Sequence, residues 1–265
     1  MSAATGNRST HVRMQNLAWQ VSLIVVFLGA WEYAADRWIP SLLVSRPSAV
    51  GRNIVEWIVD GTYLKNIGVT IQAVVAGFLL GAGLGTAIGF VTGGWRRLGD
   101  ILEPFFTAFY TLPRLALAPL FLLWFGLGIE FRIVFAAVVI FFLVYYNTFY
   151  GVREVSRELI DAVRIMGASR LQIARRVILP SALVWVAAGL KISVPYALVG
   201  VVVAEMLASN EGMGYLLSRS ATQFSSSGVF ASIAALLVIS LIISRLVAVL
   251  TSRALRWKTR SEAID

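Results

Sequence analysis

Six apolar runs alternate with shorter polar stretches along the chain. They lie at about Leu17–Ala35, Leu64–Thr92, Ile101–Gly126, Phe131–Tyr150, Leu183–Ala208 and Val229–Leu250. Because a helix rises about 1.5 Å per residue, roughly 20 apolar residues cross a hydrocarbon core about 30 Å thick. The pattern predicts an all-α integral membrane protein with about six transmembrane helices.

The polar stretches divide the chain into segments. Residues 1–16 show no apolar period and are expected to form a cytoplasmic tail, residues 17–250 the six-span domain, and residues 251–265 a basic cytoplasmic tail. A cleavable signal peptide is an alternative for the first run, because basic residues precede it and Ala34-Ala35 ends it. We favour a span, since a length of about 19 residues fits a membrane crossing better.

Two short surface helices are expected outside the spans, and the first of them is amphipathic. One begins at Pro47, a residue suited to the first helical position, and ends near Gly61. The other is expected at Tyr215–Thr222, within the polar stretch before the last span.

Composition excludes several kinds of function. Hydrophobic residues make up 58% of the chain and charged residues 14%, so a soluble globule would lack polar surface. There is no cysteine, and the single histidine, His11, lies in the polar amino-terminal stretch. We therefore predict no catalytic residue, no metal site and no enzymatic activity of the chain itself.

The basic residues indicate an orientation. With the amino terminus inside, 14 of the 23 basic residues fall in cytoplasmic segments and 6 in outer segments. The positive-inside rule therefore predicts that both termini are cytoplasmic. The net charge of +9 fits loops held against anionic membrane lipid, and no nucleic-acid partner is expected.

Glycines recur every four residues in the second span. They are Gly77, Gly81, Gly85, Gly89 and Gly93. Four residues advance a helix by about 400°, so these glycines form one groove that another helix can approach closely. The groove serves either a sliding contact in a moving bundle or ordinary membrane packing.

Prolines interrupt the third span, and Pro195 interrupts the fifth. Two cations, Arg114 and Lys191, stand near these bends. A cation within a span is costly, so these residues are candidates for attracting an anionic solute in a central pathway. The alternative is that each reaches an interface or pairs with Glu103 or Glu205.

The charged segment Arg153–Pro180 separates the fourth and fifth spans. Its first part, Arg157–Met166, predicts a short amphipathic helix whose apolar face carries Leu159, Val163 and Met166. Such a short segment is not expected to form a core of its own. Its apolar faces therefore require the membrane bundle on one side and a soluble partner on the other.

A second short helix is expected in the same segment. Gly167 suits the left-handed end of the first helix, and Ser169 with Gln172 forms a capping-box pair that begins the next. Pro180 is expected to prevent a smooth continuation into the fifth span. A DNA-binding helix-turn-helix is disfavoured, because acidic residues dilute the charge and spans hold both ends.

This segment resembles the "EAA" motif of permease subunits of bacterial ABC importers. The matching residues are Asp161-Ala162-Val163, Gly167 and Val177-Ile178-Leu179-Pro180, with Asp161, Val163 and Val177 as mild departures. The nitrate, sulfonate, taurine and bicarbonate permeases are similar in further stretches, which are Leu112–Leu120, Leu123–Gly128, Asn147-Thr148, Val203–Met206 and Gly212–Leu216. Leu143 stands where this family commonly has proline, which affects the bend expected in the fourth span.

The resemblance implies a type I ABC importer permease in the bacterial inner membrane. It would pair with a second permease copy, two ATPase subunits and an external solute-binding protein, with ATP and magnesium bound only by the ATPase. The implied ATPase-coupling residues are Arg157, Glu158, Asp161, Ala162, Val163, Arg164, Gly167, Ala168, Ser169, Leu179 and Pro180. The proposed pathway comprises Arg114, Asn147, Lys191 and Glu205.

Two other functions were considered. An ion- or proton-coupled transporter acting alone is the main alternative, although the spans hold few carboxylates for a proton relay and no histidine. A membrane-embedded enzyme would need a convergent nucleophile or metal-ligand set, and none can be assembled from these residues. The solute is expected to be small and anionic, of the sulfonate, taurine or nitrate type.

Overall fold

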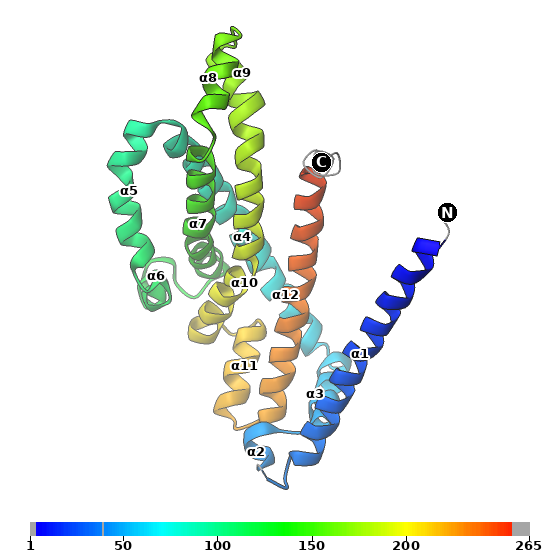
Figure 1. The fold of residues 1–265 in the computed structure, drawn as a ribbon. Helices are drawn as coiled ribbons and strands as arrows, with labels where there is room; N and C mark the ends of the chain where they lie inside the picture. Colours follow the sequence, from blue (N-terminus) through cyan, green and yellow to red (C-terminus); the bar gives the residue numbers. More distant parts are fainter. Residues whose placement is uncertain (1–3, 39, 256–265) are drawn as a thin grey trace. The chain divides into compact units, whose positions relative to one another are not determined.

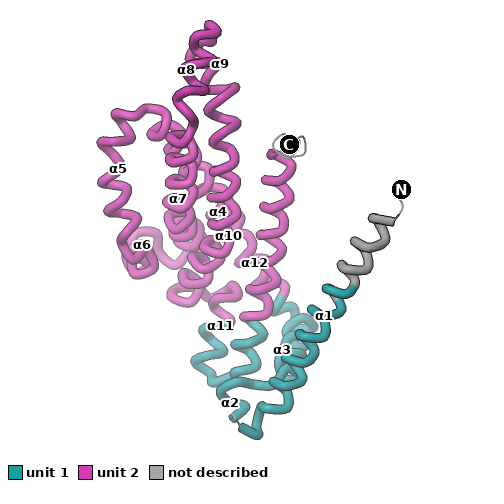
Figure 2. Tube along the Cα trace, viewed as in Figure 1, with its two compact units in different colours: residues 1–63, 217–232 teal, residues 64–216, 233–265 magenta. Residues whose placement is uncertain are grey.

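The computed structural model describes residues 4–38 and 40–255, which are almost entirely helical (Figure 1). The chain divides into two compact units. Unit 1 comprises residues 1–63 and 217–232, and unit 2 comprises residues 64–216 and 233–265 (Figure 2). The all-α prediction is confirmed.

Unit 1 contains α1 (Ala4–Ala34), α2 (Ser41–Val44) and α3 (Pro47–Val59). The predicted amphipathic helix after Pro47 is present as α3. The Glu32 carboxylate accepts hydrogen bonds from the Ser48 backbone N–H at 3.0 Å and its hydroxyl at 2.7 Å. Glu32 therefore satisfies a backbone donor that the first turn of α3 leaves free.

The amino-terminal stretch is helical, although its sequence shows no apolar period. Residues 4–16 belong to α1, whereas residues 1–3 lie outside the described residues. Extending an existing helix needs no new nucleation, so the apolar part of α1 allows the polar residues before it to continue the helix. Residues 256–265, which include most of the predicted basic tail, also lie outside the described residues.

Unit 2 holds most of the spans. Its helices are α4 (Thr62–Gly94), α5 (Arg96–Thr111), the 3-10 helix η1 (Arg114–Leu117), α6 (Ala118–Phe125), α7 (Ile129–Arg153), α8 (Arg157–Ile165), α9 (Arg170–Ile173), the π-helical turn η2 (Ala174–Ile178) and α10 (Leu179–Ala208). Helix α4 begins with two residues of unit 1, and α11 (Met213–Thr222) and α12 (Ser226–Ala254) also contribute to both units. The surface helix expected at Tyr215–Thr222 is the greater part of α11.

Helix α7 forms the centre of unit 2, with 14 of its residues buried. It runs unbroken past Leu143, so the absence of a proline there coincides with a continuous helix. Small residues permit its close contacts with α10, because a Cβ on Gly200 would stand 3.1 Å from the Cα of Ala136. A Cβ on Gly151 would likewise overlap the side chain of Trp185. Close helix approach through small residues is typical of membrane bundles.

The glycine groove of α4 lies against α7. A Cβ on Gly77 would stand 2.9 Å from the Cβ of Ala136, and one on Gly85 would stand 2.7 Å from the Phe141 carbonyl oxygen. A Cβ on Gly89 would stand 2.7 Å from the Cβ of Thr148. The repeat therefore brings two backbones together along several turns, as close packing between membrane helices requires.

Four helices among the described residues are long and apolar enough to cross a membrane, namely Thr62–Gly94, Ile129–Arg153, Arg170–Ala208 and Ser226–Ala254. A fifth crossing results if α5 and the helices η1 and α6 form one span bent by 80°. The first predicted span has an apolar helical part of 17 residues, Ala18–Ala34. All six predicted runs are helical, and four to five of them meet the requirements of a span.

The bend of the third predicted span is at Pro113, whereas Pro104 lies inside a continuous α5. The prediction that Pro180 prevents a smooth continuation into the fifth span is wrong, because residues Arg170–Ala208 form one long helix. Proline cannot donate to the carbonyl four residues earlier. The preceding turn widens to a π-helix instead, with the Leu179 N–H bonded to the Ala174 carbonyl, and the helix continues.

Candidate functional site

The charged segment projects beyond the ends of α7 and α10 as two short helices joined by a turn (Figure 1). The Ser156 hydroxyl caps α8 by accepting from the Leu159 N–H at 3.3 Å. Gly167 has φ +86°, a left-handed conformation that glycine adopts without a steric penalty. The predicted capping box of α9 is present, since Ser169 and Gln172 bond each other's backbone N–H groups.

The segment also forms a small apolar cluster, contrary to the expectation that it has no core. Val155, Ile173 and Val177 are buried, and Val163 packs against them from α8. The apolar residues at the tip remain uncovered, with Ile165 87% and Met166 85% exposed. The predicted apolar face is therefore divided between an internal contact and an exposed patch.

Most of the predicted coupling residues are solvent-accessible. Arg157, Glu158 and Ala162 are exposed on α8, and Asp161 forms an ion pair with Arg164 at 2.8 Å. In contrast, Leu179 and Pro180 lie in the long helix beyond the π-helical turn. The exposed residues of α8 and Gly167 are thus available to a partner, while the Leu-Pro pair contributes to the helix that carries the segment.

Arg153 anchors the base of this segment to α5. Its guanidinium Nη2 donates to the Asp100 carboxylate at 2.6 Å, and Nη1 lies 3.8 Å from Glu103. The guanidinium carbon also lies 4.3 Å from the centre of the Phe149 ring. Sequence reasoning counted Arg153 only as a basic residue, because its acidic partners lie more than 45 residues away in the chain.

A buried polar network lies at the other end of unit 2. Glu205 of α10 is 1% exposed and accepts hydrogen bonds from the Thr70 hydroxyl at 2.9 Å and the Gly214 N–H at 2.7 Å. Arg132 of α7, 6% exposed, lies 3.9 Å from Glu205 and 3.8 Å from Glu211. The network connects α4, α7 and α10 with the segment that leads into α11.

Backbone amides complete this network. The Gly212 N–H donates to the Asn66 side chain at 2.6 Å, and the Met213 N–H donates to the Thr70 hydroxyl at 2.8 Å. Gly212 has φ +105°, and its Cβ position is occupied by the Glu205 carboxylate. This glycine therefore allows the turn before α11 to fold directly over Glu205.

The structure does not bring the four predicted pathway residues into one site. Arg114 donates to the Val139 carbonyl at 3.0 Å and lies 4.9 Å from the Tyr110 ring centre, whereas Lys191 is exposed on α10. Asn147 donates to the Leu143 carbonyl within α7 at 2.8 Å. Glu205 does not line a pathway in this structure, because its carboxylate is enclosed by the network.

The proposed pairing of Arg114 or Lys191 with Glu103 or Glu205 is also wrong. Glu103 lies beside Arg153, and Glu205 lies beside Arg132. Arg132 is one of the six basic residues that the sequence-based orientation assigned to outer segments. Its position one residue inside an apolar run was the available signal, since a cation there needs a buried partner.

Four to five apolar helices long enough to cross a membrane, with two short charged helices beyond them, define a multi-pass membrane protein. Residues 81–256 match the family described as "Binding-protein-dependent transport system inner membrane component". The chain belongs to this family, whose members are permease subunits of ABC importers. It is a multi-pass membrane subunit and not the ATPase.

Individual relatives support the same assignment. The putative aliphatic sulfonates transport permease protein SsuC of Bacillus subtilis is 34% identical over 92% of this chain and 90% of the relative. The formylaminopyrimidine transport permease protein ThiX of Halalkalibacterium halodurans is 32% identical over 87% of this chain and 92% of the relative. The riboflavin transport system permease protein RibX of Chloroflexus aurantiacus is 30% identical over 83% of this chain and 82% of the relative.

A solved structure supports the fold. A chain of the MetNI methionine ABC transporter, in an inward-facing conformation, superposes with a TM-score of 0.53 and 19% sequence identity. The match covers 76% of this chain and 96% of that chain. The fold is that of the ABC importer permeases.

Proposed function

We propose that this permease forms half of the translocation pathway of an ATP-driven importer and that a second permease copy forms the other half. Each permease would dock its charged segment on one of two ATPase subunits, which bind ATP and magnesium. An external binding protein would deliver the solute. The supporting observation is the exposed apolar tip of the segment, Ile165 and Met166, presented beside Gly167 at the end of two spans.

The proposed orientation places both termini and the charged segment on the cytoplasmic side of the bacterial inner membrane. The excess of basic residues in these segments supports it. Helix α8 would transmit closure of the ATPase dimer to α7 and α10, because it is connected to α7 and packs through Val163 on the apolar cluster at the start of the long helix. The chain would contribute apolar area and polar contacts to this interface and no catalytic group.

An aliphatic sulfonate is the first solute to test. Arg114 and Lys191 are cations in spans, and one relative is named for aliphatic sulfonates, although others are named for a formylaminopyrimidine and for riboflavin. The permease should be reconstituted in liposomes with its ATPase and binding protein and supplied with labelled sulfonate. Uptake that needs both ATP and the binding protein supports the proposal. Uptake by the permease alone would instead identify a secondary transporter.

Coupling is expected to fail in two variants of the charged segment. Gly167→Val forces a β-branched residue into a left-handed conformation, and Asp161→Lys replaces the partner of Arg164 with a like charge. Both should reduce ATP-driven uptake about tenfold or more while the permease remains in the membrane and the ATPase keeps hydrolysing ATP. Uptake and hydrolysis measured in the same vesicles test this.

The controls are Gly29→Val and Glu154→Lys. Gly29 lies in α1 with nothing within 4 Å of its Cβ position, and Glu154 is an exposed acidic residue of the charged segment without an ion pair among the described residues. Both should transport normally. If Gly167→Val and Asp161→Lys also show normal uptake, this segment does not couple ATP hydrolysis to transport.

The pathway hypothesis predicts that removing a cation slows uptake of an anionic solute. Arg114→Ala and Lys191→Ala should each lower the initial rate by about tenfold, because each cation would raise the local anion concentration. Arg245→Ala, in the span α12, is the matched control and should transport at the normal rate. Equal rates in all three variants would show that neither cation faces the pathway.

A further inference from the structure

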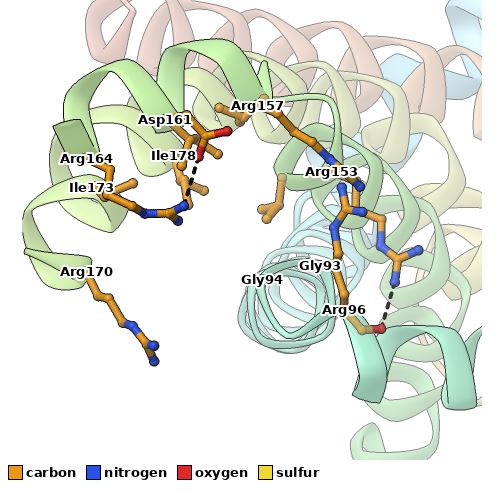
Figure 3. Close-up of a pocket in the computed structure, with 13 residues that line it drawn as sticks. Gly93, Gly94, Arg96, Arg153, Arg157, Asp161, Arg164, Arg170, Ile173 and Ile178 are labelled. Carbon is orange, nitrogen blue, oxygen red and sulfur yellow. Dashed lines mark hydrogen bonds and ion pairs between the residues drawn. The ribbon is translucent and has the colours of Figure 1, made fainter.

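A cavity of about 670 Å³ lies between the charged segment and the ends of α4 and α7 (Figure 3). Its walls come from the α4–α5 turn, the last turn of α7, helix α8 and helix α9. Five arginines line it together with one carboxylate, and these residues are Arg96, Arg153, Arg157, Arg164, Arg170 and Asp161. Apolar side chains, including Ile160 and Ile173, form the rest of the lining.

The charges of this cavity are not balanced by the residues that the structure describes. Arg153 pairs with Asp100, and Arg164 pairs with Asp161, the only carboxylate in the lining. The side chains of Arg96, Arg157 and Arg170 have no hydrogen bond or ion pair with any residue that the structure describes. These three exposed guanidinium groups give the lining of the cavity a net positive charge, which attracts an anion.

The position of the cavity favours a membrane lipid as the source of this anion. Its lining includes Gly93 and Gly94, the last residues of the apolar helix α4. Trp95 follows directly and is 63% exposed. Tryptophan is enriched where apolar helices leave the hydrocarbon core, so the position of Trp95 beside the cavity favours a lipid headgroup as its ligand. Basic pockets between spans at the cytoplasmic surface are known binding sites for anionic headgroups.

We propose that this cavity binds the phosphate-bearing headgroup of an anionic phospholipid from the cytoplasmic leaflet. The guanidinium groups of Arg96, Arg157 and Arg170 contact the headgroup, and the isoleucines contact the glycerol and the first acyl carbons. The lipid thereby joins the α4–α5 turn to α8 and α9, the two helices of the charged segment. The leaflet rests on the orientation proposed above, whereas the binding site itself does not depend on transport.

Native mass spectrometry of the full-length permease tests the site. The protein, in a neutral detergent, is titrated with phosphatidylglycerol, and the bound lipid is counted. Wild-type permease should retain phosphatidylglycerol in preference to phosphatidylcholine. The double variant Arg96→Gln/Arg170→Gln should bind it roughly 25-fold more weakly, at about fivefold for each basic side chain removed. Arg96→Lys/Arg170→Lys should restore most of the binding, because the charges return.

The matched control is Arg97→Gln/Arg175→Gln, which removes one exposed arginine from α5 and one from the π-helical turn η2, neither of which lines the cavity. Its affinity for phosphatidylglycerol should equal that of wild type. Equal affinity in the cavity variant, or equal retention of phosphatidylcholine by wild type, overturns the proposal. Displacement of the lipid by an equal concentration of inorganic phosphate also overturns it, since the ligand would then be a soluble anion.

A final arm adds the ATPase to the lipid-bound permease. Retention of phosphatidylglycerol in the complex supports the lipid site, whereas release on complex formation assigns the cavity to the ATPase and overturns it. Uptake is measured separately. Absence of lipid binding together with normal uptake would contradict this site and leave the proposed function intact. Normal lipid binding without ATP-driven uptake would contradict the proposed function and leave this site intact.

Discussion

Replacing Glu205 with leucine is expected to lower the free energy of unfolding by about 3 to 5 kcal/mol, because Arg132 then remains buried without the buried carboxylate beside it. Glu205 is enclosed at 1% exposure, and its loss also leaves the Thr70 hydroxyl and the Gly214 N–H without their acceptor. Unfolding of the detergent-solubilised permease by sodium dodecyl sulfate, followed by circular dichroism, measures the change.

Two companion variants identify the cause. The carboxylate of Glu211 is 40% exposed and also lies near Arg132, so Glu211→Gln should cost less than about 1 kcal/mol. The double variant Glu205→Leu/Arg132→Leu should recover much of the lost stability, because neither charge is then buried alone. If Glu205→Leu unfolds at the wild-type detergent concentration, the network does not stabilise the fold.

Replacing Gly81 with alanine is expected to destabilise the permease by about 1 to 3 kcal/mol, the usual cost of overpacking. The new Cβ would overlap the carbonyl oxygen of Ala137, and a backbone atom cannot move aside as a flexible side chain does. Helices α4 and α7 would have to separate along the glycine groove. The same detergent titration measures the loss.

Gly83 provides the matched control two residues away. Nothing lies within 4 Å of its Cβ position, so Gly83→Ala should be neutral or stabilising by up to about 1 kcal/mol, because alanine favours the helix. Opposite signs for the two substitutions would show that the helix contact, and not helix propensity, determines the result. Equal effects would contradict the close packing of α4 on α7.

Local patterns in the sequence predicted the helices and their junctions. The apolar runs, the glycines at intervals of four and the capping pair Ser169–Gln172 each act within a few residues, so their consequences follow from the chain alone. Gly167 was predicted at a left-handed helix end for the same reason. The family could likewise be assigned from the charged segment and the stretches that resemble known permeases.

Other features required the tertiary structure. The π-helical turn at Ala174–Ile178 accommodates Pro180 without ending the helix, so one long helix is present where an interruption was expected. The polar tail at residues 4–16 continues α1, which periodicity could not indicate because no apolar face is present. In both cases, the residues themselves do not favour a continuous helix, but the helix to which they are joined extends through them.

The sequence by itself determined a polytopic α-helical permease with a hinged, charged segment between two spans, because period, capping and motif spacing are local properties. Only the tertiary structure decided which charges are partners. Arg132 meets Glu205 and Arg153 meets Asp100, although each pair is separated by more than 50 residues of chain. The choice of partner for each of these charges depends on which helix faces meet, and helical periodicity shows a face without showing its neighbour.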